Sequence, residues 1–173
     1  MRTSEQGAPS EPEKPAPAPS AFLLAQANIN PLTGLASDYL NHFHEAIMLL
    51  EMMADIPSCR DLFLQWRPLT YPQHFHASTL QHRDVTIAAY EAAEHDVRER
   101  LERLTDGMIA VLMATREALQ SPLPRDAQVT LAERAAAWLK PLVARAGAVI
   151  NGFDNAGTAS IDPQQAVDAL MQR

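Results

Sequence analysis

An apolar stripe over about residues 96–119 constrains the fold of this chain more than any other feature of its sequence. The stripe alternates steps of four and three residues over three heptads, and it consists of Val97, Leu101, Leu104, Met108, Val111, Thr115 and Ala118. This spacing places the side chains on one face of a helix. A face of this kind packs against another helix at a shallow crossing angle. The stripe therefore predicts a fold in which helices pack along one another.

Two more segments show helical patterns that would pack against this one. Residues 36–54 carry apolar side chains on most sides, because Met48 and Met52 widen an already apolar face. An excess of this kind indicates a helix that is central or that carries an interface. Residues 73–93 form the other pattern, in one piece or two, and a short helix is expected before it at 61–66.

A fourth helix is expected to begin near Asp126 or Thr130 and to end at Asn151. Thr130 and Glu133 have the spacing of a capping box. Pro141 lies within the segment. We expect it to kink or split the helix, because proline lacks an amide hydrogen and clashes with the preceding turn.

These elements predict an all-α fold with a four-helix-bundle-like domain over residues 34–151, connected up-down-up-down. Residues 1–33 are expected to form a disordered tail. The first 20 of them hold five of the 13 prolines, and such a mixture has little apolar surface to bury. Residues 152–173 are expected to form a flexible linker and a short terminal helix.

Composition narrows the classes of function. A hydrophobic content of 47% excludes a wholly disordered chain, and a net charge of −7 argues against nucleic acid, whose binding needs a basic face. The single cysteine, Cys59, has no partner for a disulfide or a CxxC metal site, which fits a reducing compartment. The chain has no apolar run long enough to span a membrane. We therefore expect a cytoplasmic protein without a cofactor.

A metal site is the first chemical alternative. His42 and Glu45 are three residues apart on the first predicted helix, and Glu91 and His95 lie near the end of the second. Di-iron bundles use a Glu-x-x-His motif from each of two helices and a glutamate from each of two others. The order here is His-x-x-Glu, and no Glu-x-x-His occurs in the chain. Surface and loop histidines are the simpler interpretation.

Two further patterns concern phosphotransfer. Asp61 and Gln65 share a helical face and resemble the acid–amide pair of bundle phosphatases that act on response regulators. A solvated helical turn explains the same pair. His82 is a candidate phosphotransfer histidine, but the residues after it lack the lysine and small residue that accompany such a histidine. The chain has neither a GxSxG motif nor a glycine-rich phosphate loop.

The end of the chain carries a compact helix signal. Asp162 can cap a helix, and Pro163 suits its first position. An apolar edge with one carboxylate follows, made by Val167, Asp168, Leu170 and Met171. Over about nine residues this segment resembles the short N-terminal peptide of the flagellar motor switch protein, with proline where that pattern has serine. A related helix ends a chemotaxis phosphatase. The resemblance implies docking of these four residues on a CheY-like receiver domain.

The sequence thus predicts a non-enzymatic adaptor or regulator that acts through protein–protein contacts. The over-apolar helix at 36–54 would bind one partner or a second copy, and the terminal helix would bind another, with a receiver domain as the candidate. The alternatives are a metal-binding, di-iron-like bundle enzyme and a structural oligomer that uses the same apolar helix.

Overall fold

The computed structural model describes residues 20–153, and this part of the chain is helical apart from its connections and an isolated bridge between Ile29 and Ala36. The predicted all-α fold class is confirmed. No helix in the described range is long and apolar enough to cross a membrane. The expectations for residues 1–19 and 154–173 lie outside the described residues.

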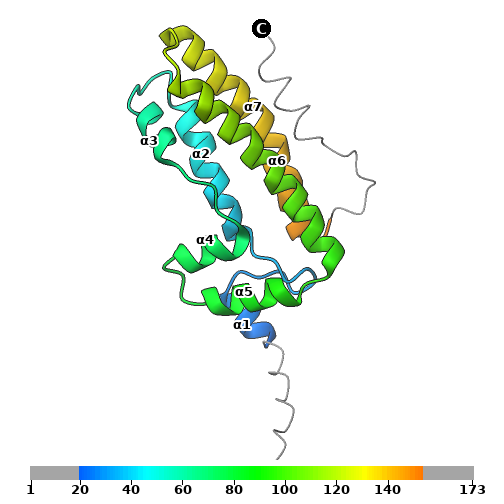
Figure 1. Cartoon of the computed structure of the whole chain (residues 1–173). Helices are drawn as coiled ribbons and strands as arrows, with labels where there is room; N and C mark the ends of the chain where they lie inside the picture. The colour runs from blue at the N-terminus through cyan, green and yellow to red at the C-terminus, as the bar shows by residue number, and fades with distance from the viewer. Residues whose placement is uncertain (1–19, 154–173) are drawn as a thin grey trace, which may run out of the picture.

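Two long helices, α6 (His95–Gln120) and α7 (Arg125–Ile150), run antiparallel and pack along each other (Figure 1). The apolar stripe predicted for α6 is confirmed as its inner face. Its buried members are Val97, Leu101, Leu104, Met108, Val111 and Thr115. Ala118 is half-buried. The Thr115 hydroxyl donates to the carbonyl oxygen of Val111 at 2.7 Å, so burial of this polar group leaves no donor unpaired.

Helix α7 begins at Arg125, beside Asp126, the first of the two expected starts, so Thr130 lies inside the helix and does not cap it. The helix runs without a break through Pro141, which corrects the expectation that this proline would split it. The amide that proline lacks would have bonded the carbonyl of Ala137, and both residues are exposed. Water can hydrate that carbonyl, so the missing bond does not end the helix.

The third member of the core is α2 (Asn41–Glu51), which follows a 3₁₀ turn at Ser37–Leu40 and packs against α7. The central position expected for this segment is confirmed, but the α-helix is shorter than the expected 36–54. The buried side is made by Phe43, Ala46, Ile47 and Leu50 of α2 and by Met53 just past its end. Helix α3 (Cys59–Gln65) packs against α2 and α6 and confirms the short helix expected at 61–66, which begins two residues earlier and ends one residue earlier than expected.

The pattern over 73–93 forms two short helices, α4 (Tyr71–Ala77) and α5 (Arg83–Ala92), which lie across one end of the long helices (Figure 1). Of the two forms expected for this segment, the structure has the one in two pieces. Because both pieces lie across the end of the long helices, the expected up-down-up-down order does not form. Helix α4 starts at a capping box, in which the Thr70 hydroxyl accepts from the Gln73 amide and the Gln73 side chain accepts from the Thr70 amide.

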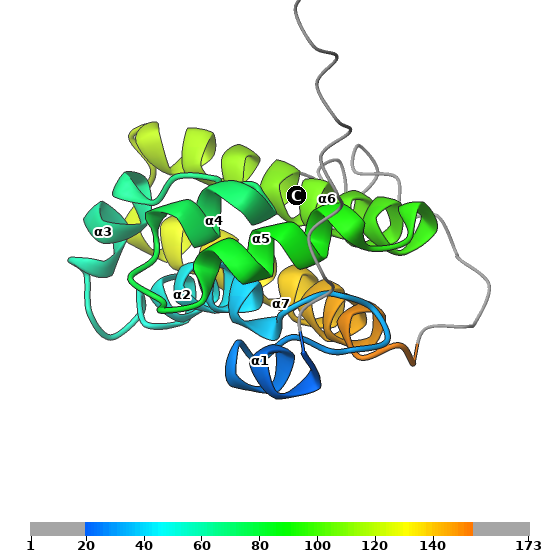
Figure 2. The same cartoon turned by 90° about the horizontal axis from the view of Figure 1, so that it is seen from below.

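Residues 20–33 correct the predicted extent of the disordered tail. They form α1 (Ala21–Gln26) and a loop that places Ile29 and Thr33 in the core. The buried Thr33 hydroxyl donates to the carbonyl oxygen of Ile150 at 2.6 Å. Figures 1 and 2 show α1 at the same end of the molecule as α5, where α7 finishes. The folded domain thus begins well before residue 34.

Candidate functional site

An exposed apolar stripe extends along α2 and past its end. It consists of Met48, Met52 and Ile56, whose side chains are 50%, 38% and 41% exposed. The amide of Met52 donates to the carbonyl oxygen of Met48 at 2.9 Å, and the amide of Ile56 donates to that of Met52 at 2.8 Å. These bonds continue the helical spacing, so the three side chains share one side. We call this surface the methionine stripe.

A groove between α2 and α7 adjoins the stripe and has a volume of about 320 Å³. Ile47, Met48 and Val143 give it apolar walls. Glu51 of α2 and Lys140 of α7 also line the groove, and they form an ion pair across it. Both side chains are about half exposed, so the pair contributes little to stability and serves mainly to fix charges beside an apolar surface.

The sequence predicts that the helix in residues 36–54 is either central or carries an interface, and the structure places its apolar side chains both in the core and at the surface. Leu40, Leu49, Leu50 and Met53 are used in the core, whereas Met48 and Met52 are left at the surface. The helix is therefore central on one side and carries unpartnered apolar side chains on the other. Methionine is flexible and polarizable, and it recurs on surfaces that adapt to more than one partner.

The candidate metal ligands lie on three different elements. His42 is buried on α2, Glu45 is exposed one turn later, Glu91 is near the end of α5, and His95 begins α6. Within residues 20–153 no group of three or more His, Cys, Asp or Glu is arranged to hold a metal ion. The structure therefore does not gather these four residues into one ligand set.

His42 takes part in an aromatic cluster instead. Its ring stacks on Trp66 with centroids 4.6 Å apart, and the ring of His74 is 5.8 Å away. Burial, reinforced by the neighbouring His74, lowers the pKa of His42 to about 4. The imidazole is therefore neutral at pH 7, which suits its place between α2, α3 and α4.

The phosphotransfer candidates occupy ordinary positions. Asp61 and Gln65 lie one turn apart on α3 and are both exposed, and the Asp61 carboxylate pairs with Arg60 at 3.1 Å. His82 is the residue before α5, where its carbonyl oxygen accepts from the Thr86 hydroxyl at 3.1 Å. It is not on the exposed face of a long helix, where a phosphotransfer histidine is expected.

A cleft of about 340 Å³ between α6 and the α4–α5 pair contains residues that sequence reasoning did not bring together. Its polar lining includes Tyr39, Tyr71, Tyr90, Glu102, Thr105 and Asp106. The Tyr90 hydroxyl donates to Glu102, and the rings of Tyr71 and Tyr90 stack with centroids 4.4 Å apart. Burial raises the pKa of Tyr39 to about 12 and also raises that of Tyr90.

The two carboxylates of this cleft are four residues apart on α6, which was the one signal in the sequence. Burial and the charge of Glu102 raise the pKa of Asp106. The phenols remain protonated, and each hydroxyl has a hydrogen-bond partner. Tyr39 and Tyr90 donate, to the carbonyl oxygen of Leu69 and to Glu102, whereas Tyr71 accepts from the amide of Ala36. The cleft thus joins the 3₁₀ turn at Ser37–Leu40 to α4, α5 and α6 through polar contacts.

The remaining predicted contact residues, Val167, Asp168, Leu170 and Met171, lie outside the described residues. Comparison with known proteins gives no family for the chain. No family model, no curated protein and no solved structure matches it. The function of this chain is therefore inferred from its own surfaces.

Proposed function

We propose that this chain is a non-enzymatic helical adaptor or regulator that acts through protein–protein contacts. The methionine stripe carries the proposal, because it leaves three large apolar side chains in a row at the surface beside a groove. Contiguous apolar surface with a polar rim is typical of contact sites in soluble proteins.

The occupant that fits this site is an amphipathic helix of a partner protein. A helix lying along α2 beside the groove would place apolar side chains on Met48, Met52 and Ile56, which repeat at one helical turn. The ion pair of Glu51 and Lys140 offers both signs of charge at the rim. A partner helix with flanking charges of either sign could then be oriented by these two residues.

The terminal segment would supply a second contact. Its resemblance to a receiver-binding peptide favours a response-regulator receiver domain as the partner of Val167, Asp168, Leu170 and Met171. Two contacts on one chain raise the effective concentration of each partner for the other. This is the sense in which the chain would act as an adaptor.

Site-specific crosslinking tests the first contact. A photoreactive residue is placed at position 52, in the stripe, and in a parallel sample at position 32, where Leu32 is 85% exposed and lies on the N-terminal loop. We expect one protein to crosslink at position 52 and not at position 32, through a segment with an apolar helical repeat. Recovery of the same proteins from both positions would overturn the proposal.

Binding by the purified partner completes the test. The double substitution Met48→Gln with Met52→Gln should weaken its affinity at least about tenfold, whereas Leu32→Gln should not. Crosslinking of the chain to itself through position 52, with a mass that falls on dilution, would instead establish the structural oligomer.

A further inference from the structure

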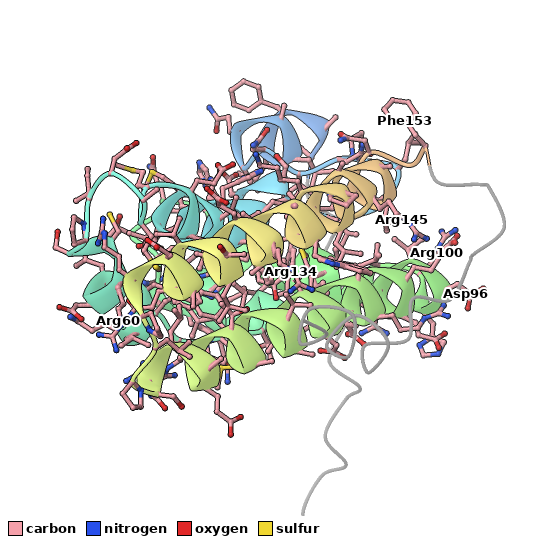
Figure 3. The ribbon with its side chains drawn as sticks, turned by 90° about the horizontal axis from the view of Figure 1, so that it is seen from above. Arg60, Asp96, Arg100, Arg134, Arg145 and Phe153 are labelled. Carbon is pink, nitrogen blue, oxygen red and sulfur yellow. The ribbon has the colours of Figure 1, made fainter. Side chains whose placement is uncertain are left out.

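A second surface runs along the seam between α6 and α7. Figure 3 shows Arg134 and Arg145 of α7 and Arg100 of α6 along this seam. Arg134, Trp138 and Arg145 recur at steps of four and seven residues, so they share one face of α7. The same rule places Arg100 and Gly107, seven residues apart, on one face of α6.

The two faces are in register. The connection at 121–124 makes the helices antiparallel, and residues equally far from it lie at the same level. Arg100 is as far from this connection as Arg145, and Gly107 is as far from it as Trp138. We call these five residues the arginine seam: Arg100, Gly107, Arg134, Trp138 and Arg145.

Between its arginines the seam has apolar surface and a notch. Trp138 is 38% exposed, a large fraction for an indole. A Cβ atom built on Gly107 would meet no atom within 4 Å, so the α6 backbone leaves space at the level of the indole. Arg145 forms no salt bridge with another residue in the range 20–153. A ligand for this surface needs apolar side chains flanked by carboxylates.

We propose that the arginine seam is the docking site of residues 162–172 of the same chain. This segment has the required chemistry. Its apolar edge is Val167, Leu170 and Met171, and its carboxylates are Asp162 and Asp168. The apolar edge would lie on Trp138 and in the notch at Gly107. The carboxylates would face the seam's guanidinium groups, with which they form strong, charge-assisted hydrogen bonds.

The length of the chain permits this placement. Residues 154–161 span at most roughly 26–29 Å when extended. The distance along α7 from Ile150 back to Arg134 is about 24 Å, at 1.5 Å per helical residue. Eleven residues as a helix cover about 16 Å, which matches the stretch between the level of Arg145 and that of Arg134. Tethering keeps the local concentration high, so a weak contact suffices.

Such docking would regulate the adaptor, a consequence that rests on the proposed function. The side chains held in the seam are the same ones that the terminal segment offers to a receiver domain. The two bound states exclude each other, so the partner must displace the segment. The apparent affinity of the partner is then its intrinsic affinity multiplied by the fraction of molecules in which the segment is undocked.

Acrylamide quenching of tryptophan fluorescence tests the docking in the full chain, without any partner. The chain has two tryptophans, and Trp66 is buried, so changes in quenching report on Trp138. The double substitution Leu170→Asp with Met171→Asp should raise the quenching constant at least about twofold. The control places the same two charges in the linker, as Thr158→Asp with Ala159→Asp, and should leave quenching unchanged.

A charge exchange tests the pairing. Arg134→Asp with Arg145→Asp should expose Trp138 to the same extent, and adding Asp162→Arg with Asp168→Arg should restore its protection. Equal quenching in the original chain and the Leu170→Asp, Met171→Asp variant would overturn the proposal. So would protection that disappears on dilution, because the segment would then bind a second copy. Either failure leaves the methionine stripe untouched, since no partner takes part.

Discussion

The indole of Trp66 lies nearly flat against the imidazole of His42, with an interplanar angle of 24°, and its Nε1 donates to the carbonyl oxygen of His42 at 3.1 Å. The two contacts fasten the end of α3 to the start of α2. They also enclose the imidazole, so that its neutral form belongs to the folded state and its protonated form does not.

Stability should therefore fall as the pH falls through this histidine's range. Burial lowers the pKa of His42 from 6.5 to about 4. Between these two pH values the unfolded chain binds a proton at this histidine and the folded chain does not. The contribution of His42 to the free energy of unfolding is complete above pH 6.5. It is lost as the pH falls toward 4 and amounts to on the order of 3 kcal/mol. Urea unfolding at pH 7.5 and 5.0 measures this, and His42→Gln should flatten the pH dependence. His44→Gln, an exposed change on the same helix, is the control. An unchanged slope in the His42 variant would contradict the assignment.

Thr33→Val should cost about 1–2 kcal/mol in the free energy of unfolding. The substitution keeps the shape of the side chain but leaves the carbonyl of Ile150 without its buried donor. Hydrogen exchange should show faster opening of residues 29–36 in this variant. Thr79→Val, at an exposed position, is the control and should be neutral. Equal stabilities for the two variants would show that the hydrogen bond contributes nothing.

Two glycines should respond to alanine in opposite directions. Gly34 has φ +70°, and a Cβ there would lie 2.9 Å from the carbonyl oxygen of Ala89. Gly34→Ala should destabilise the fold by about 1–3 kcal/mol. Gly107→Ala meets no atom within 4 Å inside a helix, and it should stabilise by about 0.5–1 kcal/mol. Thermal unfolding of both variants decides this, and a stable Gly34→Ala protein would refute the close approach of the loop to α5.

The hydrogen bond from Tyr90 to Glu102 should show energetic coupling. Tyr90→Phe removes the donor and Glu102→Gln removes the charge, so each single change should cost about 1–2 kcal/mol. The double variant should cost less than the sum by at least about 0.5 kcal/mol. A double-mutant cycle in urea measures the coupling. Strict additivity would mean that the cleft is held by ring packing alone.

Local periodicity explains which parts of this fold were predictable. The stripe of α6 is a property of neighbouring turns, so the sequence alone located its buried residues. Whether Pro141 ends a helix depends on whether the carbonyl of Ala137 faces water, which is a tertiary fact. The burial of Thr33 depends equally on α7, far along the chain. Neither was accessible from a window of adjacent residues.

The surfaces divide in the same way. The surplus of methionine in residues 36–54 pointed to the methionine stripe, because a helix cannot bury every side. The tyrosine cleft gave no comparable signal, since Tyr39, Tyr71 and Tyr90 come from three elements that meet only after folding. The arginine seam likewise depends on the register of α6 against α7. Composition shows how many arginines a chain has, and packing decides which of them become neighbours.

The hydrogen bond between Thr33 and Ile150 joins residues 117 positions apart. During synthesis the threonine leaves the ribosome long before its acceptor exists. The loop that carries it cannot form this hydrogen bond until the last turn of α7 has been synthesised. Contacts of such long sequence separation form late and slow the completion of folding. We therefore expect chaperones to bind the N-terminal loop of a nascent chain that is stalled before residue 150.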